Sequence, residues 1–400
     1  MTLIYYVWVL IQVLIGYNLI LPIILFLIYS LRHLFRSGIK PAIPSNEEDY
    51  AIIITAYQQT TLLPAAVDSV LNLRYSNFMI YVVADNCDVS NLKFDDERVI
   101  LLRPEEILAS NTASHFYAIR NFKREHTRLT IIDSDNLVDE NYLTGLNSLF
   151  DQGYSAVQGI RKAKNLDTTY ACLDAARDIY YHFYDGKILF ELGSSATLSG
   201  SAMAFKTELY RECLEKLEIK GAGFDKVLQF EIVKRGLRIA FAERAIVYDE
   251  KTSQSQQLVK QRSRWINTWF RYYNFGLILL SRGLTRLSLN QSLFGVILLR
   301  PPLFIFLILS VFCLFINLWL SVNAALVWLI SLIIFVTGFA IALVASKTPQ
   351  KIYNALITIP KFMFFQVVSL MKIRSANEIS IATEHYHTNT KDISKTEGSA

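Results

Sequence analysis

The sequence lacks acidic residues over a long C-terminal stretch. Between Glu250 and Glu378 there is no Asp or Glu, while Lys and Arg recur. Inside this stretch residues 301–346 carry no charge at all, and residues 2–31 near the N-terminus are uncharged as well. Uncharged apolar runs of this length argue against a wholly soluble chain and predict membrane spans. A basic, acid-free stretch beside such runs is expected to face anionic lipid and the cytoplasm.

Several short motifs of known chemistry are also missing. The four cysteines have no CxxC spacing, which argues against a zinc site and suits a reducing compartment. We expect these thiols to be unpaired: Cys87, Cys172, Cys213 and Cys313. No GxGxxG follows the first predicted strand and no GxxxxGK[ST] occurs, so a dinucleotide enzyme and a P-loop enzyme are disfavoured.

The composition mixes apolar and charged segments. Hydrophobic residues make up 52% of the 400 residues and the mean hydropathy is +0.29, yet 19% of the residues are charged. This mixture is typical of a water-soluble domain joined to membrane segments.

Residues 1–31 are expected to form an N-terminal transmembrane helix. The alternative is a cleaved signal peptide, but the apolar run is long and no small-residue cleavage site is evident. Arg32, His33, Arg36 and Lys40 follow the run directly. Because positive residues mark the cytoplasmic side of a span, they predict a cytoplasmic location for the domain that follows.

The C-terminal part is expected to return to the membrane. Residues 301–346 are long enough for two spanning helices with a turn at Ser321–Asn323, whereas Pro360 and Lys361 interrupt the next apolar segment. The expected order after the anchor is a cytoplasmic domain at 48–250, amphipathic interface helices at 251–300, a transmembrane pair at 301–346, an interfacial or re-entrant helix at 352–374 and a polar tail at 375–400.

Short apolar runs alternate with helical patterns in the cytoplasmic domain. Strands are expected at Tyr50–Thr55, Phe78–Ala84, Val99–Leu102 and Arg128–Ile132, and helices at Leu62–Leu73 and Ala113–Glu125. This alternation indicates an α/β fold with a mostly parallel sheet, which binds ligands at the carboxyl ends of its strands. Asp85 and Asp133 both fall at that edge.

The turn Asp133-Ser134-Asp135 is a candidate metal site. Carboxylates suit hard cations such as Mg²⁺ or Mn²⁺, which also coordinate phosphate oxygens. The alternative is an ordinary Asx turn that leaves a strand. Asp85 begins a second acidic turn, which is either a surface turn or an acceptor of hydrogen bonds from a nucleotide base or ribose.

Asp225 precedes a predicted helix at residues 226–235, which Gly236 ends. It is either the N-cap of this helix or a general base that removes a proton from an attacking hydroxyl.

Gln261, Arg264 and Trp265 lie at i, i+3 and i+4, so on a helix they share one face. Arg264 suits a diphosphate and Trp265 suits a sugar ring. The alternative is a basic interfacial helix with its tryptophans at the lipid headgroups.

Together these residues resemble the family 2 glycosyltransferases with a GT-A fold, and in particular the membrane-integrated processive branch that includes cellulose, chitin and hyaluronan synthases. The resemblance covers residues 49–269 and the flanking hydrophobic layout. Four features occur in the family's order: the acidic turn at Asp85, the DxD of Asp133 and Asp135, the aspartate Asp225 before a helix, and QxxRW at Gln261–Trp265.

The resemblance implies a GT-A catalytic domain and an inverting transfer. It makes Asp225 the catalytic base on the acceptor hydroxyl, and it makes Asp135, with Asp133, the ligand of Mg²⁺ or Mn²⁺. The nucleotide sugar would be contacted by Asp85, Asp133 and Arg264, and the acceptor by Trp265, Gln261, Ser199 and Gly200.

The sequence departs from the family's common pattern at three places. Tyr57-Gln58-Gln59 stands where a Glu is frequent, Phe224 stands where a Glu usually precedes the catalytic Asp, and His115 stands where a Lys is frequent. These changes leave the core chemistry in place but weaken the inference of the donor sugar. The segment Thr383-Glu384-His385 resembles a short C-terminal motif of some relatives.

Three functions are weighed. The first is transfer of a sugar, with a UDP-sugar favoured as donor, to a growing polysaccharide at the cell membrane. The second is single transfer to a lipid-linked acceptor, and the third is a non-catalytic membrane protein that binds nucleotides. Intact Asp135, Asp225 and Arg264 argue against the third. The expected partners are the nucleotide sugar, a glycan or lipid-linked acceptor and membrane lipid, but no nucleic acid. Three spans are few for a polymer channel, which keeps the second function open unless the protein forms a homo-oligomer or has an export partner.

Overall fold

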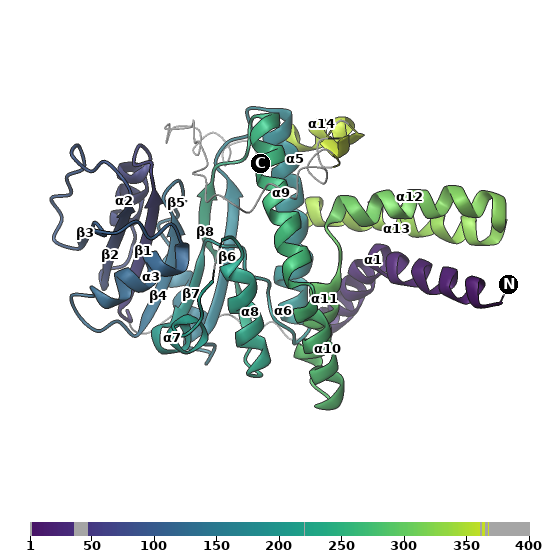
Figure 1. The fold of residues 1–400 in the computed structure, drawn as a ribbon, viewed down its shortest axis with the longest axis horizontal. Coiled ribbons are helices and arrows are strands. Elements are labelled where there is room, and N and C mark those ends of the chain that lie inside the picture. The colour runs from purple at the N-terminus through teal and green to yellow at the C-terminus, as the bar shows by residue number, and fades with distance from the viewer. Residues whose placement is uncertain (1, 36–46, 220, 361, 365–366, 368–400) are drawn as a thin grey trace.

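The computed structural model describes residues 2–35, 47–219, 221–360, 362–364 and 367. An α/β domain forms one end of the molecule, and three long helices project together from the other end (Figure 1). They are α1 (Thr2–Leu34), α12 (Leu303–Leu320) and α13 (Val322–Ala345). The predicted fold, a mostly parallel α/β sheet with flanking apolar helices, is confirmed.

The domain is built on an eight-stranded sheet with the order β3-β2-β1-β4-β7-β6-β8-β5. Strands β3, β2, β1 and β4 run parallel, β7 runs antiparallel between β4 and β6, and β6 is parallel to β8. The strand bounds are β1 Tyr50–Tyr57, β2 Phe78–Asp85, β3 Val99–Leu102, β4 Arg128–Asp133, β5 Leu137–Val138, β6 Ala156–Ala163, β7 Met203–Lys206 and β8 Ile239–Asp249.

The parallel strands read as continuous apolar runs because helices bury both of their faces. The register places Asp85 opposite Tyr57 and Asp133 opposite Thr55, so both acidic residues lie at the carboxyl edge of the sheet, as predicted. Helices α2 (Leu63–Leu71), α3 (Asn111–Arg120) and α4 (Tyr142–Phe150) belong to this part of the chain.

The helix predicted at Ala113–Glu125 is shorter than expected. It begins at Asn111, where the Ser110 side chain accepts a hydrogen bond from the Ala113 N–H as an N-cap. It ends at Arg120, because the backbone N–H of Lys123 donates to the Tyr81 hydroxyl at 2.9 Å. His126 contacts the same hydroxyl at 2.8 Å. These contacts hold the chain against β2 instead of continuing the helix.

A long helical segment connects the sheet to the projecting helices. Helix α5 (Thr169–Tyr181) continues into the π-helix η1 (His182–Ile188) and the short α6 (Leu189–Glu191). The other helices of the described residues are α7 Thr207–Leu214, α8 Phe224–Lys234, α9 Ser255–Tyr272, α10 Asn274–Thr285, α11 Leu289–Leu299, α14 Gln350–Ala355 and η2 Leu356–Thr358.

Helices α10 and α11 pack closely because glycines face the contact. A Cβ atom added at Gly283 would lie 2.4 Å from the backbone nitrogen of Ser292, and one added at Gly295 would lie 2.6 Å from that of Leu280. The segment 251–300, expected to form amphipathic interface helices, thus folds as α9 followed by this hairpin.

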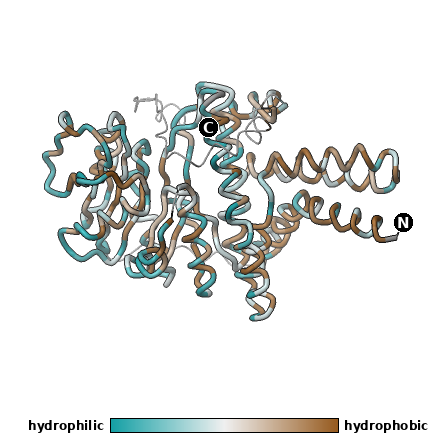
Figure 2. Tube along the Cα trace, in the orientation of Figure 1, coloured by the Kyte–Doolittle hydropathy of each residue, from teal (hydrophilic) through white to brown (hydrophobic). Residues whose placement is uncertain are grey.

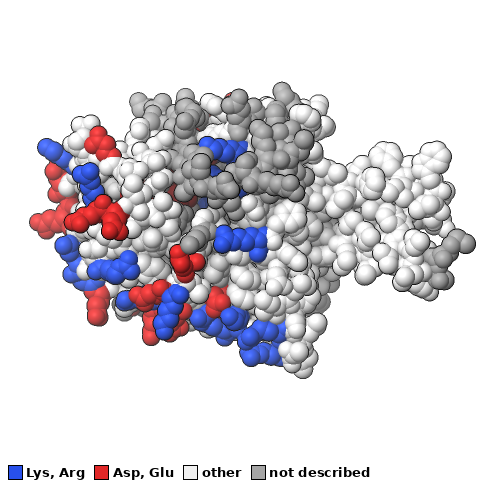
Figure 3. All heavy atoms as spheres, in the orientation of Figure 1, with Lys and Arg blue, Asp and Glu red and all other residues white. Residues whose placement is uncertain are grey.

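The three projecting helices are long and apolar enough to cross a membrane. In Figure 2 these helices are mostly brown, the colour of hydrophobic residues, and Figure 3 shows no charged side chain on their visible face. One polar contact joins them: the Gln12 side-chain oxygen accepts from Asn317 Nδ2 at 2.6 Å and from Trp328 Nε1 at 2.7 Å. Near the C-terminal end of α1, Arg32 donates to the backbone oxygen of Leu192 at 3.3 Å and ties α1 to the domain.

Some predicted features lie outside the described residues. They include Arg36 and Lys40 after α1, Lys361, most of residues 364–374, and the whole tail 375–400 with Thr383–His385. The described part of 352–374 is helical through α14 and η2.

Candidate functional site

A cavity of about 1090 Å³ lies between the carboxyl edge of the sheet and the base of the projecting helices. Its polar wall contains the turn Asp133–Asn136, the loop Ser199–Gly200 and the start of α8 at Asp225. Gln261, Arg264 and Trp265 of α9 line the same cavity. The structure therefore brings all but one of the predicted site residues together.

The DxD turn is held in place by a serine from another segment. Strand β4 ends at Asp133, and the Asn136 N–H donates to the Asp133 carbonyl at 3.1 Å to close the turn. The Ser201 hydroxyl accepts from the Asp133 N–H at 3.1 Å and lies 2.5 Å from Asn136 Oδ1. The metal-site candidate and the 199–201 loop thus form one unit.

The oxygen donors at this turn fit a hard divalent cation. Asp133 and Asp135 contribute carboxylates to the cavity wall. Among the described residues no group of three or more His, Cys, Asp or Glu side chains could hold a metal ion. Two carboxylates are nevertheless enough for Mg²⁺ or Mn²⁺ when phosphate and water complete the coordination.

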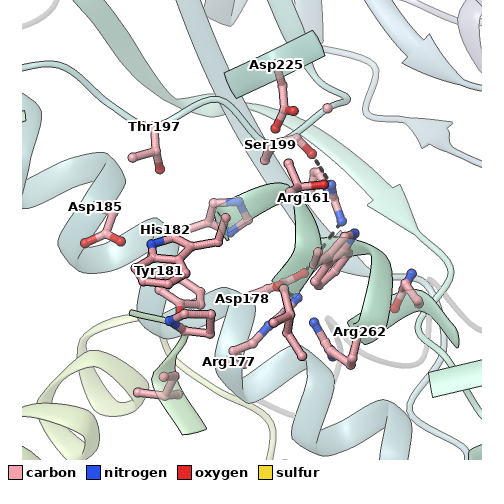
Figure 4. Close-up of a pocket in the computed structure, with 18 of the residues that line it drawn as sticks. Arg161, Arg177, Asp178, Tyr181, His182, Asp185, Thr197, Ser199, Asp225 and Arg262 are labelled. Carbon is pink, nitrogen blue, oxygen red and sulfur yellow. Dashed lines mark hydrogen bonds and ion pairs between the residues drawn. The ribbon is translucent and has the colours of Figure 1, made fainter. Parts of the chain in front are cut away.

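The 199–201 loop has a shape that depends on glycine. Gly200 has φ of +90°, a left-handed conformation that side chains disfavour. The Ser199 N–H donates to Gln158 Oε1 at 2.9 Å, and the Arg161 guanidinium donates to the Ser199 carbonyl, as Figure 4 shows. The loop is therefore fixed to β6 and presented to the cavity.

Asp225 is not an N-cap, so the capping interpretation is wrong. Helix α8 begins one residue earlier at Phe224, its N-cap is Gly223, and no side chain caps it. Asp225 instead faces the cavity, with its carboxylate 3.2 Å from Lys226 Nζ. Lys226 Nζ also donates to the Leu198 carbonyl at 3.2 Å, which ties Asp225 to the segment before Ser199.

Gly223 allows α9 to approach Asp225. Its φ is +103°, and an added Cβ would lie 2.6 Å from Thr268 Cγ2 and 2.8 Å from Tyr272 Cε2. Since no side chain fits there, the last turns of α9 press directly against the backbone that carries Asp225. This contact between Gly223 and α9 therefore brings Asp225, the predicted base, next to the helix that carries QxxRW.

The QxxRW residues lie along one face of α9. Gln261 accepts from the Thr252 hydroxyl at 3.2 Å, and burial lowers the pKa of Arg264. The guanidinium groups of Arg177 and Arg262 lie near the ring of Trp265, at 4.4 and 4.2 Å from its centroid. Trp265 remains 38% exposed, which leaves ring surface for a ligand.

Asp85 is the predicted site residue that does not line this cavity. Its side chain is 2% exposed, and its two oxygens accept from the N–H groups of Leu108 at 3.0 Å and Ala109 at 2.7 Å. The carboxylate thus shapes the loop before α3. His115, where the family resemblance led us to expect a Lys, is also buried; it contacts the Tyr210 hydroxyl at 2.7 Å, and burial lowers its pKa to about 3.

A buried ion network in the cavity wall escaped prediction from the sequence. Lys251 Nζ lies 2.5 Å from Asp178 and 2.6 Å from Asp249, and Arg161 lies 2.5 Å from Asp249. Arg177 pairs with Asp178 as well. We define the ion network as these residues with two further members: Arg161, Asp174, Arg177, Asp178, Asp249, Lys251 and Arg262.

The surrounding charges of the network favour the charged forms of two members, Asp178 and Arg161. Burial alone would raise the pKa of Asp178, but Arg177, Lys251 and Arg161 hold it well below its usual range. Burial alone would lower the pKa of Arg161, but the surrounding carboxylates, including Asp133 and Asp135, raise it. One signal in the sequence points to the network: Asp174, Arg177 and Asp178 lie at i, i+3 and i+4 in an otherwise apolar helix.

The comparisons with known proteins can now be set beside this geometry. The family described as "Glycosyltransferase like family 2" matches residues 47–268, more than half of the chain. The mannosyltransferase PcManGT from Pyrobaculum calidifontis, in complex with GDP-Man and Mn²⁺, has a TM-score of 0.58 at 15% identity over 93% of this chain and 99% of that one. S. aureus TarS 1-349, in complex with UDP-GlcNAc, has a TM-score of 0.42 at 12% identity over 82% and 92%. A search of curated proteins found no match.

The mostly parallel sheet, with an acidic turn at its carboxyl edge, is that of a GT-A domain, and the likeness to PcManGT supports this fold. The family match extends from before β1 into α9 and covers both the DxD turn and the QxxRW face. The chain belongs to glycosyltransferase family 2.

The ion network predicts a large difference between two lysine variants. Lys251→Met removes the cation between two buried carboxylates, so we expect a loss of about 3–5 kcal/mol in the free energy of unfolding. Lys187→Met breaks the exposed pair with Glu243 at 2.7 Å and should change stability by less than about 1 kcal/mol. Denaturant unfolding in detergent measures both; equal losses would contradict a structural role for the network.

Proposed function

We propose that this glycosyltransferase moves a sugar from a nucleotide-diphosphate sugar to a hydroxyl group of a lipid-linked acceptor. One observation carries the proposal: a single cavity continues from Asp133 and Asp135, past Asp225 and Trp265, to side chains of α12 and α13. A polar reaction centre and an apolar chamber are thus two parts of one cavity. An amphiphilic substrate can occupy both parts at once.

The apolar part of the cavity is extensive. Its lining comes from helices that are apolar enough to cross a membrane and from the segment after α14: Leu303, Phe304, Leu307, Leu332, Phe335, Val336, Phe339, Leu343, Leu356 and Ile359. An acyl or isoprenoid chain bound there would gain about 0.8 kcal/mol for each buried CH₂ group. A hydrophilic polysaccharide would gain nothing comparable from such walls.

The donor would bind at the DxD turn. Asp133 and Asp135 would hold Mg²⁺ or Mn²⁺, which would offset the charge that develops on the leaving diphosphate. Arg264 would contact the diphosphate from α9. PcManGT, which shares the fold, was solved with GDP-Man and Mn²⁺, and the resemblance to the processive branch favours a UDP-sugar. Both nucleotide classes are therefore candidate donors.

The acceptor would react beside Asp225. Its carboxylate would take the proton of the acceptor hydroxyl while the oxygen forms a bond to the anomeric carbon and the nucleoside diphosphate leaves with the electron pair of the broken bond. The contact with Lys226 would orient the carboxylate. Gln261, Trp265, Ser199 and Gly200 would border the acceptor sugar, because they line the same cavity as Asp225.

The topology belongs to the same proposal. Arg32 follows the apolar run of α1 and Arg300 precedes α12, so positive residues stand at the domain-proximal ends of both helices. By the positive-inside rule, the catalytic domain would lie in the cytoplasm and the chain would be a multi-pass protein of the cell membrane.

Asp225→Asn tests the base. We expect transfer to fall about 10²–10⁴-fold, because the amide cannot take the proton. The affinity for the nucleotide sugar should stay unchanged. Transfer is measured with purified protein in detergent and donor binding by calorimetry, with the exposed helix variant Asp68→Asn as the matched control. Wild-type turnover in Asp225→Asn would remove this residue from the base role.

The DxD assignment predicts metal dependence. EDTA should stop transfer and Mg²⁺ or Mn²⁺ should restore it, because the turn offers only oxygen ligands suited to such ions. Asp135→Asn should raise the metal concentration needed for half-maximal activity by at least about tenfold. Diphosphate release is followed as a function of metal concentration; metal-independent release would contradict the assignment.

The acceptor assignment predicts a particular product. Purified protein given a panel of UDP- and GDP-sugars with a membrane lipid extract should release nucleoside diphosphate and yield an organic-soluble product. Mass analysis should find one sugar, or very few, per lipid. A water-soluble ladder of chain lengths would instead favour the polysaccharide function and the processive branch.

A further inference from the structure

Two polar side chains in the cavity wall are left without a partner. His182 and Thr197 line the cavity and are partly exposed, so a ligand inside it can reach them. Neither side chain makes a hydrogen bond or an ion pair with another residue that the structure describes. Figure 4 draws both of them around the pocket that also holds Ser199 and Asp225. We call His182 and Thr197 the polar pair.

The imidazole of His182 is supported from behind by an aromatic ring. His182 is the first residue of the π-helix η1, a type of segment that is frequent at functional sites. A Cβ atom added at Gly186 would lie 2.5 Å from Phe241 Cε2, so the missing side chain lets the Phe241 ring pack against η1. The centroid of this ring lies 6.2 Å from that of His182. Because Phe241 is buried and is not part of the cavity lining, it fixes His182 without covering its cavity side.

Thr197 is held beside η1 through its backbone. Its N–H donates to the carbonyl of Asp185 at 3.0 Å, three residues after His182. The next N–H, that of Leu198, donates to Gln229 Oε1 at 3.0 Å. Since these contacts use only backbone groups of residues 197 and 198, the Thr197 hydroxyl keeps its hydrogen-bonding capacity for a ligand.

The polar pair suits sugar hydroxyl groups better than a phosphate. Burial lowers the pKa of His182 to about 4 and outweighs the opposing effect of the Asp178 carboxylate. The imidazole is therefore neutral near pH 7 and offers one N–H donor and one acceptor nitrogen, and the Thr197 hydroxyl also donates and accepts. A sugar hydroxyl has the same double capacity, whereas a phosphate is an acceptor that is bound best by cationic donors.

The polar pair lies toward the apolar helices. Tyr184 of η1 donates to the carbonyl of Gly338 in α13 at 2.8 Å, so η1 packs against a projecting helix. Thr197 comes two residues before Ser199, which is proposed above to border the acceptor sugar. The pair therefore belongs to the wall between this loop and the apolar chamber.

We infer that His182 and Thr197 bind hydroxyl groups of the acceptor sugar and select acceptors that carry them. A site built to hydrogen-bond a hydroxyl rejects a ligand that lacks it, because the polar groups of the site are then left unpaired. This inference rests on the acceptor proposed above and adds two specificity-determining residues to the reaction.

The test uses two pairs of variants that separate hydrogen bonding from shape. His182→Gln keeps a donor and an acceptor, whereas His182→Phe keeps only a ring. Thr197→Ser keeps the hydroxyl, whereas Thr197→Val keeps only the shape. Two rates are measured with the purified full-length protein in detergent: transfer to a membrane lipid extract, and hydrolysis without acceptor of the UDP- or GDP-sugar that the wild type hydrolyses fastest.

We expect His182→Phe and Thr197→Val to lower kcat/KM for the extract by about 5–100-fold, the cost of an unpaired hydrogen-bonding group. His182→Gln and Thr197→Ser should keep most of the transfer, and hydrolysis should stay at the wild-type rate in all four variants. A role in packing alone predicts the opposite order, with Phe and Val tolerated at least as well as Gln and Ser.

Thr207→Val is the matched control. The Thr207 hydroxyl also has no hydrogen-bond partner among the described residues, but it is not part of this cavity's lining. Both rates should therefore stay at the wild-type value in this variant.

The outcomes separate the polar pair from the proposed function. Wild-type transfer in His182→Phe and Thr197→Val would overturn the inference. An equal fall of transfer and hydrolysis would assign the bound hydroxyl groups to the donor sugar and overturn the selection of acceptors. A wild type that makes a water-soluble ladder would count against the lipid acceptor, and the same comparison of variants on that product would still test the pair. Should the His182 variants not fold, the Thr197 variants decide.

Discussion

The arrangement of the site depends on the buried contacts around Asp178. This carboxylate on α5 meets Lys251 from the end of β8 and Arg161 from β6, and the same network reaches α9 through Asp174 and Arg262. Because the pairs are buried, removing one partner leaves an uncompensated charge, and the elements are held in a single arrangement. The sheet, the cavity wall and the QxxRW helix are thereby fixed relative to one another.

Buried ion pairs also explain how the α/β domain is joined to the apolar helices. Helix α5 continues through η1, where Asp185 pairs with Arg300 just before α12. A π-helical segment inside a helix shifts the following side chains and is frequent at functional sites. Here it brings the Asp185 carboxylate to Arg300, the arginine that precedes α12. The polar and apolar parts of the cavity therefore share a continuous wall.

The fold was largely predictable, because buried parallel strands read as apolar runs and their ends mark the ligand edge. That logic found Asp133 and the strands that lead to it. It could not show that the oxygens of Asp85 bind the N–H groups of Leu108 and Ala109, since this contact depends on a loop without periodicity. It also missed the pairing of Arg161 with Asp249, which requires β6 and β8 to be neighbours in the sheet.

Trp265 of α9 connects the ion network with the face of α9 that lines the cavity. Arg177 and Arg262 lie near its ring, 38% of the residue is exposed, and it lines the cavity. A tryptophan ring with an exposed face suits stacking on a sugar ring. The burial of Arg262 follows from its ion pair with Asp174, so the ion network sets the surroundings of Trp265.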